Sequence, residues 1–178
     1  MKKNKIIFLI IIILLCFFSI ESFAQEKNLL KNFKNSMMDI IYGEFKEIEY
    51  FGFIYVYVKG EDAEKIGLNS EMLTKYVKLK FKNNFAYINY KNIDLPYDAP
   101  DSEKKKRGSL HIFIWTVGDD YPIAYYIRCK AGNYFDYFWE IEALGVSSKD
   151  NVPDKIKKTI GEMIEELAID FFMVRDEM

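Results

Sequence analysis

Apolar residues alternate along residues 47–59 in the two-residue period of a β-strand, but both faces of this expected strand are apolar. The two faces consist of Ile54, Val56 and Val58 on one side and of Phe51, Phe53, Tyr55 and Tyr57 on the other. A strand with one face in water carries polar residues on that face. The pattern therefore raises the question of what covers the aromatic side.

The next periodic segment predicts a helix over residues 70–82, after the turn-like stretch "EDAEKIGLN". Asn69 or Ser70 can cap the helix, and Glu71 lies in its positively polarised first turn. The expected apolar stripe contains Met72, Leu73, Tyr76 and Val77 and could extend to Leu79.

The remaining strands follow from short β-rich runs separated by turn residues. "FAYINY" at 85–90 predicts a short strand, and residues 91–108 predict an exposed loop. "SLHIFIWTVG", "IAYYIRCK" and "YFDYFWEIEALG" predict three strands joined as an antiparallel meander. A closing helix begins near Asp150 or Asn151 and has Pro153 in its first turn. Its apolar face contains Ile156, Ile160, Met163, Ile164, Leu167, Phe171 and Val174.

The element order is β-α-β-β-β-β-α, which favours an α+β fold. We expect a two-layer sandwich in which two helices cover one face of an antiparallel-rich sheet of about five strands. The aliphatic side of residues 47–59 is the better match for the helices. Tyr55 and Tyr57 then lie on the second face, where either residues 25–46 or a partner outside the chain covers them.

The amino terminus has the pattern of an export signal. Three lysines in "MKKNK" precede a 15-residue apolar run from Ile6 to Ile20, and Ser22-Phe23-Ala24 places small residues at a cleavage site. We expect a signal peptide over 1–24, a lead-in or short helix over 25–46, and one α+β domain over 47–178. The protein would be periplasmic or extracellular, with no stable membrane span after cleavage. The alternative is an uncleaved anchor in the inner membrane.

The net charge bears on nucleic-acid binding, and the cysteine content bears on disulfide formation. Removing residues 1–24 takes away three Lys and one Glu, which leaves 22 basic and 26 acidic residues and a net charge of −4. This balance gives no electrostatic support for nucleic-acid binding. Only Cys129 remains after cleavage, so no internal disulfide can form, and its position in a strand predicts a buried thiol.

Aromatic residues make up 17% of the chain and recur at alternate positions in several expected strands. Tyr and Trp tolerate half-wet positions and are enriched at contact surfaces. Three coverings of this aromatic face are open: the helices, the amino-terminal segment, or a ligand or subunit. The candidate surface consists of Tyr55, Tyr57, Phe113, Trp115, Tyr126 and Arg128, with Phe138 and Glu140 in the same alternating phase.

Candidate chemistry is sparse. His111 is the chain's only histidine, and a catalytic role would require a carboxylate such as Glu140 beside it. Asp119-Asp120 and the Glu140/Glu142 pair are explained by turn hydrogen bonding and by a solvated strand face. We therefore assign no catalytic residues, no metal ligands and no cofactor.

A basic run in the loop before the meander is the second candidate surface. Lys104, Lys105, Lys106 and Arg107 follow one another in "EKKKRG". They could contact acidic lipid head groups or a polyanion, or simply be solvated.

Residues 50–175 resemble a broad group of uncharacterised exported bacterial proteins. The resemblance rests on the D-A-x-x-x-G-L turn before a helix, here Asp62, Ala63, Gly67 and Leu68, followed by "LHIFIWTVGDDYPIAYYIRC" and a closing amphipathic helix. The group has no established activity, so the resemblance implies no functional residues.

These observations favour an exported, non-enzymatic protein that binds an unknown protein or an envelope component. Two alternatives stay open. The first is a small secreted hydrolase that uses His111 with a carboxylate. The second is a self-assembling structural subunit, which would be a homo-oligomer.

Overall fold

The computed structural model describes residues 37–38, 42–60 and 63–175. Nearly all of them belong to one compact unit, Ile41–Met178. The elements of this unit are η1 (Gly43–Glu47), β1 (Tyr50–Lys59), α2 (Ser70–Asn84), β2 (Asn89–Tyr90), α3 (Asp101–Lys106), β3 (Arg107–Val117), β4 (Ile123–Gly132), β5 (Tyr137–Ser147) and α4 (Val152–Val174). The expected signal peptide over 1–24 lies outside the described residues and stays a prediction.

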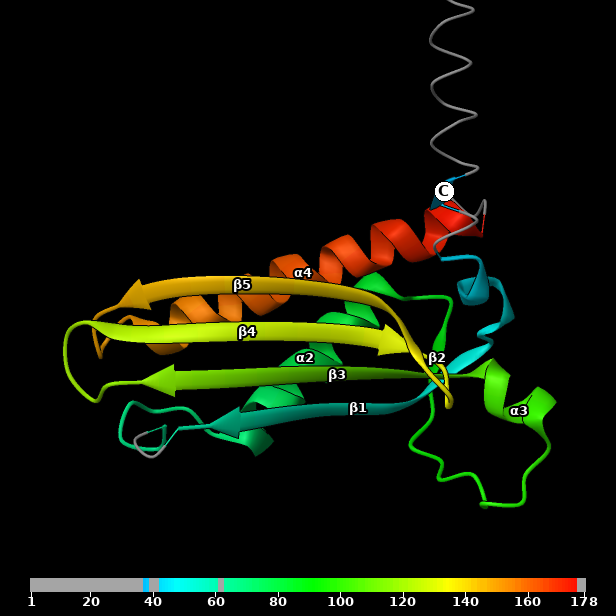
Figure 1. Ribbon diagram of the computed structural model, residues 1–178, viewed down its shortest axis with the longest axis horizontal. Helices are drawn as coiled ribbons and strands as arrows, with labels where there is room; N and C mark the ends of the chain where they lie inside the picture. Colours follow the sequence, from blue (N-terminus) through cyan, green and yellow to red (C-terminus); the bar gives the residue numbers. More distant parts are fainter. Residues whose placement is uncertain (1–36, 39–41, 61–62, 176–178) are drawn as a thin grey trace, which may run out of the picture. The chain divides into compact units, whose positions relative to one another are not determined.

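The fold is an α+β two-layer sandwich, as the sequence pattern predicts. Five strands form one sheet in the order β2-β1-β3-β4-β5. The predicted meander is confirmed, because β3, β4 and β5 pair antiparallel in sequence order. β1 pairs parallel with both β2 and β3. Figure 1 shows α2 and α4 together behind the sheet, so the helical layer lies on a single face.

The two apolar sides of β1 meet different surroundings. Ile54 and Val56 are almost fully buried beneath the helices, whereas Tyr55 and Tyr57 are 39% and 43% exposed. The expectation that the aliphatic side meets the helical layer is therefore confirmed. Phe53, Tyr55 and Tyr57 belong to the opposite face of the sheet, which we call the open face. Phe51, which the alternation places with them, is instead fully buried against Phe81 in the core, because a register irregularity between Phe51 and Phe53 shifts the alternation of β1.

Helix α2 begins at a side-chain cap. The Asn69 side-chain oxygen accepts a hydrogen bond from the backbone N–H of Met72 at 3.0 Å, as the capping pattern predicts. Leu73 and Val77 are buried on its sheet-facing side. Met72 and Leu79, which the sequence pattern places in or beside the apolar stripe, are exposed, so the buried stripe is narrower than expected.

Helix α4 supplies the centre of the core. Phe171 is fully buried, and its ring lies 5.1 Å from that of Phe45, 6.0 Å from that of Phe51 and 5.4 Å from that of Phe85. These phenylalanines come from η1, β1, the end of α2 and α4. One aromatic cluster therefore joins both helices to the sheet.

Hydrogen bonds tie the same elements together. The indole N–H of Trp139 on β5 donates to the Asp170 carboxylate at 2.9 Å, and the Tyr76 hydroxyl on α2 donates to the carbonyl of Lys157 at 3.0 Å. Arg175, just after α4, donates to the carbonyl of Ile48 at 2.9 Å. Residues 45–48, just before β1, are thus held at the helical layer rather than across Tyr55 and Tyr57.

Two stretches differ from the sequence prediction. Of residues 85–90 only Asn89–Tyr90 is strand, because Phe85 turns into the core and stacks on Phe81 at 4.2 Å. The polar stretch 91–108 contains the short helix α3, which has Asp101 and Glu103 in its first turn and three lysines in its last. This order of charges suits the helix dipole.

Cys129 is fully buried in β4, as predicted from its place in a strand. Burial raises the pKa of its thiol far above the ordinary value, so the thiol stays protonated and unreactive in the folded protein.

The aromatic cluster predicts a large loss of stability on truncation. Phe171→Ala should lower the free energy of unfolding by about 3–5 kcal/mol, because it removes a fully buried ring and leaves a cavity. Tyr87 is almost fully exposed, and Tyr87→Ala should change stability by less than about 0.5 kcal/mol. Urea unfolding followed by circular dichroism measures both, and equal losses in the two variants would contradict this account of the core.

Candidate functional site

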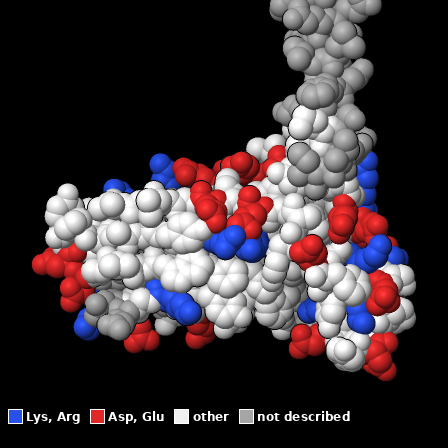
Figure 2. Space-filling view, in the orientation of Figure 1, with Lys and Arg blue, Asp and Glu red and all other residues white. Residues whose placement is uncertain are grey.

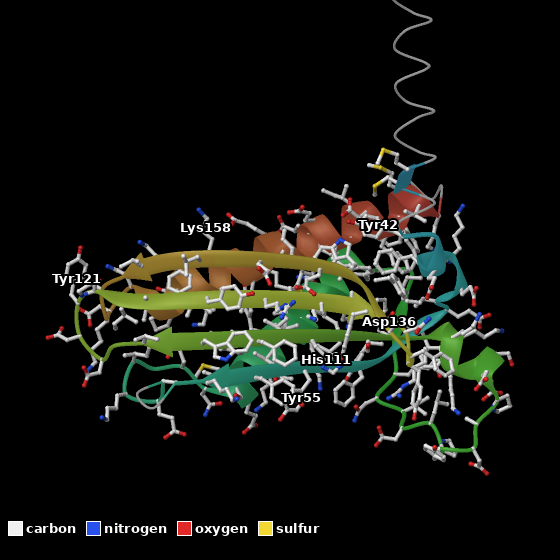
Figure 3. The ribbon with its side chains drawn as sticks, viewed as in Figure 1. Tyr42, Tyr55, His111, Tyr121, Asp136 and Lys158 are labelled. Atoms are coloured by element: carbon white, nitrogen blue, oxygen red, sulfur yellow. The ribbon has the colours of Figure 1, made fainter. Side chains whose placement is uncertain are left out.

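The open face of the sheet gathers most of the side chains singled out from the sequence. The strand register places Tyr55 beside His111, Tyr57 beside Phe113, Phe113 beside Arg128, and Trp115 beside Tyr126. All six predicted surface residues (Tyr55, Tyr57, Phe113, Trp115, Tyr126 and Arg128) therefore share one face. Figure 3 shows Tyr55 and His111 on the side of the sheet turned away from the helices.

Aromatic rings on this face form a continuous chain of contacts across three strands. The rings of Tyr55 and Tyr57 lie 4.1 Å apart, and Tyr57 stacks on Phe113 at 5.2 Å. Phe113 stacks on Trp115 at 5.7 Å, and Trp115 contacts Tyr126 at 5.3 Å. Each ring is held by its neighbours, which makes the surface rigid and lowers the entropy cost of binding to it.

A band of paired charges crosses the open face on β4 and β5. Arg128 forms ion pairs with Glu140 and with Glu142, the latter at 3.1 Å, and Lys130 pairs with Glu140 at 3.0 Å. Burial acts to raise the pKa of Glu140, but hydrogen bonds from Lys130 and Arg128 outweigh it and hold that pKa below its ordinary value. Figure 2 shows acidic and basic side chains side by side within an otherwise largely uncharged surface.

The end of the open face next to the β3–β4 connection is apolar. Leu144 lies opposite Tyr126 and is 81% exposed, and the exposed Val146 lies opposite Ala124. Across β4 from them, between β1 and β3, is a hollow of about 320 Å³, which is lined mainly by apolar atoms of Tyr57, Lys59, Phe113 and Trp115, with Val58 and Ile114. Contiguous exposed apolar surface of this kind is typical of protein interaction sites.

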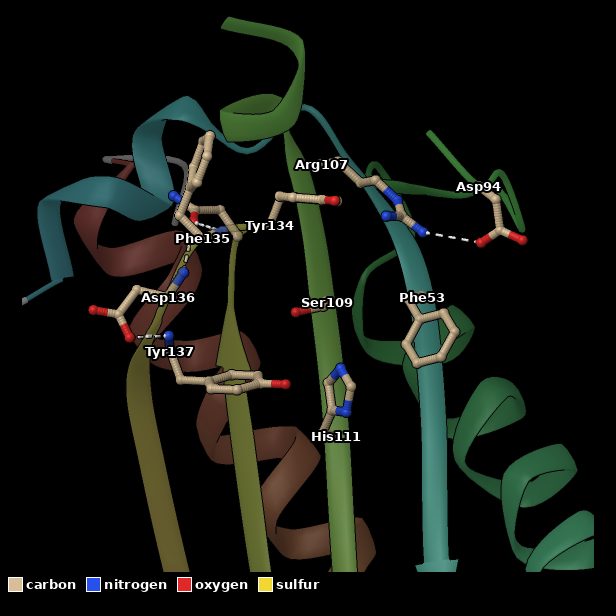
Figure 4. Close-up of a pocket in the computed structure, with 10 residues that line it drawn as sticks. Phe53, Asp94, Arg107, Ser109, His111, Tyr134, Phe135, Asp136 and Tyr137 are labelled. Carbon is tan, nitrogen blue, oxygen red and sulfur yellow. Dashed lines mark hydrogen bonds and ion pairs between the residues drawn. The ribbon is translucent and has the colours of Figure 1, made fainter. Parts of the chain in front are cut away.

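The opposite end of β3 contains a pocket of about 280 Å³ (Figure 4). Phe53, Arg107, Ser109, His111 and Tyr137 line it, together with Asp94, Asn133, Tyr134, Phe135 and Asp136. One wall is a tight turn that Asn133 organises, because its side-chain oxygen accepts hydrogen bonds from the backbone N–H groups of Phe135 and Asp136 at 2.9 and 3.1 Å.

His111 is packed among rings rather than paired with a carboxylate. Its ring lies 5.2 Å from that of Phe53 and 5.2 Å from that of Tyr137. Desolvation lowers its pKa from 6.5 to about 4, so the imidazole is neutral at physiological pH. Among the described residues it makes no hydrogen bond or ion pair with an acidic side chain, and Glu140 is engaged by Arg128 and Lys130. The pairing that a hydrolase would need is therefore not formed.

Tyr137, which the sequence analysis did not select, lies beside His111 instead of Phe138. A register irregularity between Ala131 and Gly132 shifts the alternation of β5, as a β-bulge does. Phe138 consequently contacts Phe45, with ring centres 4.9 Å apart, and does not share the phase of Glu140. Within the sequence, only the glycine at 132 hinted at this shift.

The four residues of the basic run are dispersed rather than gathered into one patch. Lys105 pairs with Glu47 at 3.7 Å and Lys106 with Glu49 at 2.6 Å. Lys104 lies over the ring of Tyr134 at 5.4 Å. Arg107 belongs to the pocket of Figure 4.

Neither a metal-binding cluster nor a membrane-spanning helix is present in the described part of the chain. No three His, Cys, Asp or Glu side chains in the described ranges are grouped so that they could hold a metal ion. No helix within those ranges is long and apolar enough to cross a membrane.

Comparisons with known proteins give structural neighbours alone. No family model and no curated protein matches the chain. A dodecamer of a PelC point variant from Paraburkholderia phytofirmans matches with a TM-score of 0.45 and 9% identity, covering 68% of this chain and 89% of that chain. A second PelC dodecamer from that organism matches with a TM-score of 0.40 and 8% identity, over 70% of this chain and 88% of the other.

A structure titled only as an uncharacterised protein has a TM-score of 0.40 and 8% identity, and covers 74% of this chain and 94% of its own. At TM-scores below 0.5, these similarities carry no inference about the activity, partner or assembly of this chain.

The packing of His111 predicts a specific pH dependence. Because the folded protein has the lower pKa, the unfolded chain binds the proton first, and stability falls as the pH drops from about 6.5 to about 4. In His111→Phe this contribution should vanish, so wild type should lose stability relative to the variant over that range. Urea unfolding at each pH measures the difference, and an NMR titration of the single imidazole gives the pKa directly. An imidazole that titrates near 6.5 would contradict the packing described.

Proposed function

We propose that this chain is an exported, non-enzymatic envelope protein that works through its open face, and that the face docks against a second copy of the chain. The observation that carries the proposal is the rigid chain of half-exposed aromatic rings on a sheet face that no described helix covers. Aromatic residues and arginine are enriched at protein interfaces.

The chemistry of the face favours a protein surface as its occupant. The hollow beside Trp115 has the size and apolar lining to receive an apolar side chain, and Leu144 offers an exposed apolar side chain on β5 of the same face. The acidic and basic groups of the central band already neutralise one another, so covering them leaves no unpaired charge.

The same charge balance favours a second copy over an acidic or basic partner. Arg128 and Lys130 contribute two positive charges to the band, and Glu140 and Glu142 contribute two negative charges. A copy related by a two-fold axis presents the same neutral band and the same apolar end, so pairing brings no net repulsion. An oppositely charged partner would gain little from a neutral surface.

Self-docking predicts an association that a single charge at the apolar end disrupts. The protein, expressed from the full-length sequence, should exceed the monomer mass in light scattering at about 100 µM, a concentration that detects micromolar affinity. Leu144→Lys should weaken this association about tenfold or more, because it places an uncompensated charge in the buried contact. Its stability should be unchanged, since the side chain is exposed.

Leu79→Lys is the matched control, because it makes the same change at an exposed leucine on α2. It should leave the mass of the protein unaltered. A wild-type protein that stays monomeric at every concentration would overturn self-docking, as would an equal effect of the two lysine substitutions.

A further inference from the structure

The pocket at the Arg107 end of the open face holds a largely buried guanidinium group that is only partly paired. The Arg107 side chain is only 11% exposed. Its Nε atom is buried without a hydrogen-bond partner in the described part of the chain. Its ion pair is with Asp94, at 3.6 Å from Nη2, and the carboxylate side chain is 99% exposed. That distance is too long for a good hydrogen bond, and water screens the exposed Asp94 carboxylate, so the ion pair contributes little.

The backbone of the neighbouring strand fixes the position of the Arg107 side chain. Arg107 lies across β1 at Gly52, where any added Cβ atom would fall 2.2 Å from its Nε atom. A glycine at this position of β1 therefore makes room for the buried arginine. The Nε–H group is one of the five N–H donors of arginine, and leaving it unpaired away from water costs free energy.

The rest of the pocket supplies neutral polar groups and flat rings. Ser109 offers a hydroxyl group, and the imidazole of His111 is uncharged. Burial raises the pKa of Tyr137, so its hydroxyl group remains a donor at physiological pH. The Asp136 carboxylate is turned away from the pocket and accepts a hydrogen bond from the backbone N–H of Tyr137 at 2.7 Å (Figure 4).

We propose that this pocket binds a small organic anion. Its carboxylate or phosphate group contacts the guanidinium of Arg107, and its flat apolar body lies against the rings of Phe53 and Tyr137. Planar oxyanions match the fork of arginine, and the volume of about 280 Å³ fits a single ring bearing one acidic group. The proposal does not rest on self-docking, because Leu144 lies toward the opposite end of the strands.

The direct test follows the Nε–H signal of Arg107 by NMR while the purified wild-type protein is titrated. The probes are benzoate, phenyl phosphate, inorganic phosphate and the neutral benzamide. We expect a saturable shift of this signal with benzoate or phenyl phosphate, and the tighter of the two identifies the acidic group. No shift with either anion up to about 10 mM would overturn the proposal, since millimolar binding would be visible there. Equal binding of benzamide, or inorganic phosphate binding as tightly as phenyl phosphate, would also overturn it.

Substitutions on either side of the ion pair should act in opposite directions. Arg107→Gln should weaken binding of the preferred anion about tenfold to a hundredfold, because charge-assisted hydrogen bonds are lost. Asp94→Asn should tighten it about twofold, because a competing carboxylate is removed. A purely structural role of Arg107 would not give this tightening.

Lys105→Gln is the matched control, since it removes one positive charge from the same basic run but outside the pocket. It should bind the anion like wild type. An equal loss of anion affinity in Lys105→Gln and Arg107→Gln would show that only the overall charge matters, and would overturn the proposed binding site. If Arg107→Gln fails to fold, the wild-type titration and Asp94→Asn still decide the question.

Discussion

The packing of α2 and α4 against one face of the sheet is the constraint from which the other features of this protein follow. Phe171 is the centre of that packing, because it meets phenylalanines from η1, β1 and the end of α2. Both long helices bury their apolar stripes there, so neither can cover the other face. The direct result is an aromatic sheet face without helical cover. Its rings pack side by side against one another instead of against a helix.

Much of this fold is predictable from the alternation of residue types. From Phe53 onward, the aliphatic and aromatic sides of β1 were enough to predict which face meets the helices. Phe51 was placed on the wrong side, because the register irregularity before Phe53 leaves no clear signal in the sequence. The parallel pairing of β1 with β3 was not predictable, because a strand alternates with the same two-residue period whichever way its neighbour runs. The helix α3 was also missed, since its six residues are too short to show an amphipathic period.

Part of the candidate site was also predictable from the sequence, and part was not. Residues on the regular parts of β1, β3 and β4 came together as their phase predicted. Tyr137 was missed because a bulge resets the phase of β5, and local sequence carries little signal for that. Arg107 looked like one more charge in a basic run. Its separate surroundings depend on Gly52, which lies more than fifty residues earlier in the chain and meets it only in the folded sheet.

The burial of His111 has a consequence for how the surface behaves in changing surroundings. Histidine is the side chain whose ordinary pKa lies within the range that natural media span, and this chain has a single one. Because the pKa of His111 is lowered to about 4, the open face has no imidazolium charge to gain or lose between about pH 5 and 8. The electrostatic character of that face is therefore the same in a neutral and in a mildly acidic medium. A contact made there would therefore keep its strength when the medium becomes mildly acidic.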